Sequence, residues 1–84
     1  MKINLYALKD CKIGFRNPFN MPNDESAKRI IRIAVNNKID ENNNEIRKFA
    51  DDIELWKVGE YDDQTGEIKS TIKFLARAID YKTE

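Results

Sequence analysis

The fold of this chain is decided by the stretch Glu54-Leu-Trp-Lys-Val-Gly-Glu-Tyr-Asp-Asp-Gln-Thr-Gly-Glu-Ile68. Within it, Tyr61 and Ile68 flank a polar segment that Gly66 closes. This is the pattern of a type I turn followed by one residue at positive φ, a conformation that glycine adopts at little steric cost. The stretch therefore predicts a β-hairpin with three structural turn residues, Asp62, Asp63 and Gly66.

Both strands of the predicted hairpin carry apolar side chains. On the first strand, alternation places Ile53, Leu55 and Tyr61 on one face and Trp56 and Val58 on the other. The second strand begins at Glu67 and carries four residues on one face, Ile68, Ser70, Ile72 and Phe74. Residues 71–80 also fit a helical stripe, so their state stays open between strand and helix. A short strand that gives way to a C-terminal helix is the favoured prediction.

The N-terminal half adds one strand, one apolar loop and one helix. Residues 2–8 alternate apolar and polar side chains, as in a half-buried strand. Residues 12–23 contain breakers but also apolar side chains, which indicates that this loop packs on another part of the protein. Asn23 or Asp24 caps a helix that runs to about Asn37. Its apolar arc of roughly 200° exceeds what one sheet face needs, so either the loop or a second subunit covers its shoulder.

The segment between the helix and the hairpin is polar. Residues 38–44 form a connection and are the best candidate for a mobile segment, and residues 45–50 form a short helical turn that buries Ile46 and Phe49. We therefore predict a single α+β domain, residues 1–84. Its small antiparallel sheet comprises the N-terminal strand and the C-terminal hairpin, and it packs on one main helix.

Composition excludes several classes of function. The chain has no histidine and one cysteine, so it offers no histidine-based catalytic site, no Cys/His zinc site and no internal disulfide. We expect a protein that is not an enzyme and that has no metal and no cofactor. No run of residues approaches a membrane span, so we expect no membrane association. With 84 residues and 40% hydrophobic residues, the core is thin, which favours a homodimer or larger homo-oligomer.

Charge is unevenly spread along this neutral chain, which has 15 basic and 15 acidic residues. Residues 1–32 are basic and the middle of the chain is acidic. Binders of single-stranded nucleic acid combine cations with aromatic rings on which bases stack. The basic part holds the candidate nucleic-acid-binding residues, which are Lys12, Phe15, Arg16, Phe19, Lys28, Arg29 and Arg32. The alternative is that the aromatic rings pack beneath the loop and the basic side chains face water.

Several of these segments occur together in one known family. The hairpin sequence GEYDDQTGEI at residues 59–68, the Asn17-Pro18-Phe19 loop and the basic helix resemble the small nonstructural protein of the gokushoviruses, a branch of the single-stranded-DNA microviruses. Ser70-Thr71-Ile72 replaces the proline-containing stretch that usually follows this hairpin.

The resemblance implies a non-enzymatic accessory protein in the host bacterial cytoplasm. Such a protein associates with single-stranded DNA during genome replication or packaging. The alternative is an assembly module that contacts capsid, replication or host proteins without binding nucleic acid.

Overall fold

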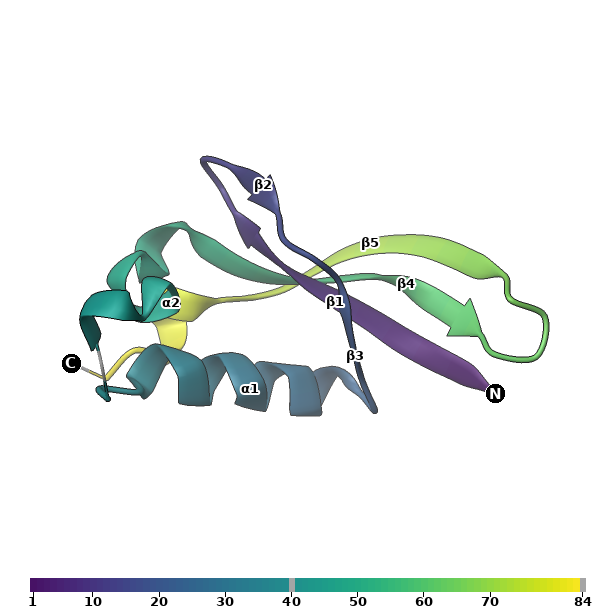
Figure 1. The fold of residues 1–84 in the computed structure, drawn as a ribbon, viewed down its shortest axis with the longest axis horizontal. Helices are drawn as coiled ribbons and strands as arrows, with labels where there is room; N and C mark the ends of the chain where they lie inside the picture. Colours follow the sequence, from purple (N-terminus) through teal and green to yellow (C-terminus); the bar gives the residue numbers. More distant parts are fainter. Residues whose placement is uncertain (40, 84) are drawn as a thin grey trace.

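An antiparallel sheet and one long helix make up the fold in a computed structural model of the chain (Figure 1). The structure describes residues 1–39 and 41–83, with residue 41 described by its backbone alone. The sheet order is β2-β1-β4-β5, and β3 pairs with β1 beside β2. The strands are β1 Lys2–Asp10, β2 Gly14–Phe15, β3 Phe19–Met21, β4 Ile53–Asp62 and β5 Ile68–Arg77. The helix, α1 Asp24–Asn36, packs on one face of this sheet, so the predicted α+β class is confirmed.

The predicted hairpin is the pair β4–β5, and its turn has the expected geometry. Gly66 has φ +81°. The amide of Gly66 donates to the carbonyl oxygen of Asp62 at 2.7 Å, and Asp62 Oδ1 accepts from the amide of Gln64 at 2.9 Å. Asp63 Oδ1 lies 3.0 Å from the N-terminal amine, which ties the turn to the start of β1. The turn is thus fixed by its own aspartates and by one glycine at positive φ.

The favoured helix from about residue 71 is wrong. Strand β5 continues to Arg77, which pairs with Glu54, and only the 3-10 turn η3 Ala78–Tyr81 follows it. The β4–β5 register shifts at Leu75, which is an extra residue of β5 between Phe74 and Ala76. The apolar residues that resemble a helical stripe in sequence therefore belong to a strand with a bulge. This bulge lets Leu75 and Ala76 both reach the protein interior.

A second irregularity, at Val58, changes which side chains share a face. Tyr6 pairs with Lys57, and its neighbour Leu5 pairs with Gly59, so Val58 is an extra residue on β4. Beyond this bulge the alternation of β4 is inverted. Tyr61 therefore shares a face with Trp56, and the prediction that it shares a face with Leu55 is wrong.

The apolar loop forms two short strands against β1. Phe19 pairs with Tyr6, and Phe19 and Met21 pack against the core. The loop therefore covers one shoulder of α1, as one of the two alternatives predicts. Ile30 and Ile33 nevertheless remain 47% and 59% exposed, because β3 lies beside the N-terminal end of the helix (Figure 1).

Helix α1 begins and packs largely as its sequence predicts. Asn23 is the N-cap, and its side chain accepts a hydrogen bond from the amide of Ser26 at 2.8 Å, so Asp24 lies inside the helix. Ala27, Ile31 and Val35 recur at the spacing that places them on one side of a helix, and all three are buried. They meet sheet residues in the core, which are Tyr6, Ile53 and Leu55.

Between α1 and β4 the chain forms three short helical turns, η1 Glu41–Asn43, α2 Glu45–Lys48 and η2 Ala50–Asp52. Ile46 packs against the core as predicted, but Phe49 is 45% exposed. The reason is that the turn points Arg47 inward instead, where its guanidinium donates to the carbonyl oxygen of Val35 at 3.0 Å. Of the predicted mobile segment 38–44, residue 40 lies outside the described residues. Among the described residues, no helix is long and apolar enough to cross a bilayer.

Candidate functional site

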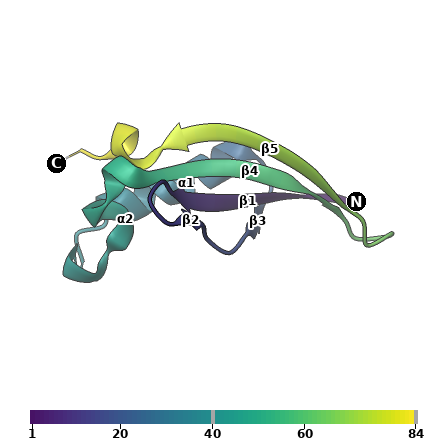
Figure 2. The ribbon, with the colours of Figure 1, turned by 90° about the horizontal axis from the view of Figure 1, so that it is seen from above.

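The sheet face that points away from α1 is here called the outer face, and no element formed by the described residues packs over it. Figure 2 looks down onto this side of the sheet, with α1 behind the strands. Directly paired residues lie on the same face of a sheet, so register defines the rows of side chains on the outer face. One row is Ala7, Trp56 and Phe74, and the next begins with Lys9 and Glu54.

Three aromatic rings and one lysine meet at this end of the outer face. The Trp56 ring lies 5.9 Å from the Phe15 ring and 5.6 Å from the Phe74 ring, in edge-to-face contacts with interplanar angles of 76°. The Nζ atom of Lys9 lies 5.4 Å from the Phe15 centroid and 5.3 Å from the Trp56 centroid. We call these four residues the aromatic cluster. It combines fixed ring surfaces with a positive charge that attracts the ring faces.

The outer two rings of the aromatic cluster are open to solvent. Phe15 is 49% and Phe74 is 45% exposed, whereas Trp56 is half-buried between them. Trp56 Nε1 donates to Glu54 Oε1 at 2.9 Å, which fixes the orientation of the indole. The central ring of the cluster is thus oriented without a ligand.

Two predicted binding residues lie on the chain next to the aromatic cluster. Lys12 follows β1, and its Nζ atom lies 4.0 Å from Asp52 Oδ2. Arg16 follows Phe15, and its guanidinium lies 3.5 Å from Glu45 Oε1. Both are ion pairs between solvent-exposed groups, which contribute little energy and can exchange their partners. Lys12 and Arg16 are therefore available to an anionic ligand at this edge.

Phe19 has a different place from Phe15, although the two were predicted to act together. Its ring lies 6.2 Å from the ring of Tyr6, on the side of the sheet that α1 covers. Phe19 is thus a packing residue, in line with the alternative that loop aromatic rings lie beneath the loop.

The basic residues of α1 form a second, separate surface. Lys28, Arg29 and Arg32 line a polar hollow of about 280 Å³ together with Glu25 and Tyr81. The Nζ atom of Lys28 lies 3.6 Å from Glu25 Oε1. Because α1 packs on the inner face of the sheet, this hollow and the aromatic cluster lie on opposite sides of the molecule. The predicted site residues are therefore divided between two surfaces.

Three members of the aromatic cluster were absent from the predicted site, namely Lys9, Trp56 and Phe74. They lie on three different strands, and only the register brings them together. The available signal was alternation, which places Trp56 and Leu55 on different faces of their strand. Without the pairing of β1 with β4, alternation does not identify the residues next to Trp56 on the other strands.

The thiol of Cys11 lies beside Glu54, the carboxylate that also accepts the hydrogen bond of the Trp56 indole. Desolvation and a hydrogen bond with Glu54 raise the pKa of the Cys11 thiol above its ordinary value. A raised pKa keeps this thiol protonated near neutral pH, and a protonated thiol is a poor nucleophile. Within residues 1–39 and 41–83, no three acidic or cysteine side chains converge as a metal site would require.

Comparison with known families adds one match. The model of a family described as phage ORF5 protein matches residues 3–81. The chain belongs to this family. The match includes every strand of the sheet and α1, so both surfaces of this ORF5 family protein lie within it. No curated protein and no solved structure matches the chain significantly.

Proposed function

We propose that this ORF5 family protein is a non-enzymatic accessory protein of a gokushovirus-type phage that binds single-stranded DNA. It would act in the host cytoplasm during genome replication or packaging. The observation that supports this proposal best is the aromatic cluster, with Lys9 placed between two rings on an uncovered sheet face. Exposed rings on a rigid sheet offer stacking surfaces to any unpaired base, and neighbouring cations attract the phosphates.

The arrangement favours single strands over duplexes. In a duplex the bases are stacked on one another and their faces are not accessible to a protein ring. On the outer face, Phe15 and Phe74 lie on either side of Trp56, so at least two bases have a ring to stack on. Lys12 and Arg16 lie on either side of Phe15 in the chain, where they would contact the phosphates of the same strand.

The basic residues of α1 take a secondary part in this proposal. Lys28, Arg29 and Arg32 supply positive charge. The aromatic ring that lines the same hollow, Tyr81, is half-buried. This surface suits phosphates without base contacts, and it would add affinity that is independent of base identity.

The test is a fluorescence-anisotropy titration with a labelled oligo-dT of about 20 nucleotides at low salt. Phe15→Ala and Phe74→Ala should each weaken binding roughly tenfold, since one base stack contributes about 1 to 3 kcal/mol. The matched control is Phe49→Ala, because Phe49 is equally exposed and also has a lysine over its ring, Lys48 Nζ at 5.8 Å, but lies outside the outer face. This control should bind like the wild type.

Two further measurements complete the test. Binding should weaken steeply with added salt, because phosphate contacts release counterions. The double change of Arg29 and Arg32 to alanine should reduce affinity and the salt dependence together, and unchanged affinity would remove α1 from the proposal. Absence of binding at tens of micromolar protein would refute the proposal as a whole.

A second candidate function is an assembly module that contacts capsid, replication or host proteins. One observation favours it. Beside the exposed Ile30, an apolar cavity of about 120 Å³ opens between α1 and the sheet, lined in part by Phe19 and Ile46. Exposed apolar groups of this kind are typical of protein contacts. Failure of the DNA titration would leave this as the better supported function.

A further inference from the structure

The far end of the β4–β5 hairpin, together with the start of β1, extends beyond α1. Figures 1 and 2 both show these strands continuing past the N-terminal end of the helix, and the molecule measures 43 Å along its longest axis. We call this part the distal ribbon and define it as residues 2–5, 59–62 and 68–72. Neither of its faces is covered by α1.

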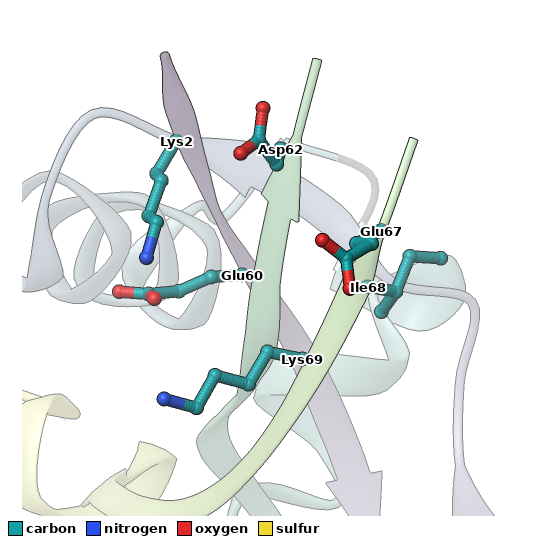
Figure 3. Close-up of a pocket in the computed structure, with 6 residues that line it drawn as sticks. All are labelled: Lys2, Glu60, Asp62, Glu67, Ile68 and Lys69. Carbon is teal, nitrogen blue, oxygen red and sulfur yellow. The ribbon is translucent and has the colours of Figure 1, made fainter. Parts of the chain in front are cut away.

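One face of the distal ribbon is charged. Figure 3 shows the side chains of Lys2, Glu60 and Lys69 on the same side, around a hollow of about 270 Å³. Glu60 pairs directly with Lys69 and also lies 3.7 Å from Lys57 Nζ. This is the same face that α1 covers further along the sheet. In the distal ribbon, the charged side chains of this face are suited to contact with water.

The opposite face of the distal ribbon, the outer one, is apolar. Ile3, Tyr61 and Ile68 form one row across the three strands, and Figure 3 shows Ile68 pointing away from Lys69. The next row is Leu5, Gly59 and Ser70. Ile68 is 69% exposed, and Ile72, which follows it on this face, is 59% exposed. None of these described side chains carries a charge.

An antiparallel ribbon with one charged and one apolar face normally buries the apolar face. We infer that a second copy of this chain covers it, so that two distal ribbons pack face to face as in a β-sandwich. A two-fold axis brings the same patch of each copy together. Because the patch has no charge, it meets its own copy without repulsion.

The alternative arrangement, in which two sheets join edge to edge through β5, is disfavoured by charge. Every charged residue of β5 is basic, namely Lys69, Lys73 and Arg77. Two such strands side by side would place like charges close together, and lysines on an edge strand are a common protection against this pairing. The face, rather than the edge, is therefore the contact surface.

The size of the patch indicates how strong the contact is. Three strands with four or five residues along each give a footprint of roughly 14 by 15 Å on each copy. This is well below the roughly 800 Å² per partner of a standard interface. The dimer should therefore dissociate on dilution. The aromatic cluster is not part of the patch, which ends at Ile72, so this inference does not rest on DNA binding.

The experiment is sedimentation velocity of the full chain over a concentration range of about 5 to 500 µM. The expected mass rises from 9.9 kDa toward twice that value with concentration. Ile72→Glu should raise the dissociation constant at least tenfold, and Ile68→Glu should do the same. The matched control is Thr71→Glu, because Thr71 is exposed on the same strand and alternation places it on the charged face with Lys69 and Lys73, and it should dimerise like the wild type.

Three results would overturn the inference. A monomeric mass at every concentration would leave the patch to a different partner. A dimer that survives Ile72→Glu but is lost in Ile33→Glu would place the contact on α1 instead. Loss of single-stranded DNA affinity in Ile72→Glu, with no change in mass, would make DNA the occupant.

Discussion

The hydroxyl of Tyr6 gives a sharp test of how the sheet is fixed to α1. Tyr6 is fully buried, and its hydroxyl donates to Asp24 Oδ1 at 2.7 Å, at the first turn of the helix. A hydrogen bond to a charged group contributes about 1.5 to 3 kcal/mol. Asp24 is only half-buried and can be hydrated when the bond is lost, so the lower end applies. Tyr6→Phe should cost about 1.5 kcal/mol, which corresponds to a fall in Tm of roughly 6 to 12 °C.

The pH dependence of this effect distinguishes the hydrogen bond from a general loss of packing. Burial, and then the contact with Asp24, raise the pKa of Tyr6 well above its ordinary value of 10.0. Because the folded state holds this proton more tightly, the contribution is fully present below pH 10 and is lost as the pH rises further. The difference in stability between wild type and Tyr6→Phe should therefore narrow from pH 9 to pH 11.

The assay is thermal unfolding followed by circular dichroism at a series of pH values, with Tyr61→Phe as the control. The hydroxyl of Tyr61 has no hydrogen bond within the described residues, so its removal should change Tm by little. If Tyr6→Phe behaves like Tyr61→Phe, or if the gap to wild type is constant with pH, the hydrogen bond to Asp24 does not stabilise the fold.

Three other substitutions test the backbone and the helix ends. Gly59→Ala places a Cβ atom 2.6 Å from the carbonyl oxygen of Lys69, so β4 and β5 must separate, and we expect a loss of about 1 to 3 kcal/mol in chemical denaturation. Gly66→Ala meets no atom within 4 Å but keeps φ +81°, so its cost of about 1 to 2 kcal/mol comes from the backbone alone, and Gly66→Asn should recover part of it. Asn44→Ala removes the amide that donates to the carbonyl oxygen of Ala34 at 2.7 Å, and we expect a loss of about 1 to 2 kcal/mol with faster amide exchange at the end of α1.

The parts of the fold that follow from local chemistry could be predicted from the sequence. The hairpin turn is specified by Asp62 and Gly66, and the start of α1 by Asn23, because each acts within a few residues of itself. A bulge has no comparable local signal in the sequence. An extra residue at Val58 is visible only when β1 is paired with β4, and without that pairing Tyr61 is assigned to the wrong face.

The same limit applies to the candidate site. Phe15 and Arg16 could be found because they combine ring and charge within one loop. The other rings of the cluster, Trp56 and Phe74, lie on β4 and β5, far from Phe15 in the sequence. Alternation within one strand does not predict which residues of distant strands are neighbours. Phe19 was included in the predicted site, but its ring packs near Tyr6. The sequence does not distinguish a loop ring that faces solvent from one that packs on the core.

The bulge at Val58 also limits how the hairpin can change in length. Val58 is the extra residue, so deleting it would restore the interrupted alternation and leave Gly59 opposite Leu5, with every side chain up to the turn on its present side. A single deletion between Gly59 and the turn has no extra residue to absorb it, and it would exchange the two sides of the residues that follow. Deletion of Glu60, for example, would put Tyr61 where Glu60 stands, and a ring would replace a charge. Apart from loss of the bulge residue itself, insertions and deletions in this segment preserve its two-sided character only in pairs, so the parity of its length matters more than the length itself.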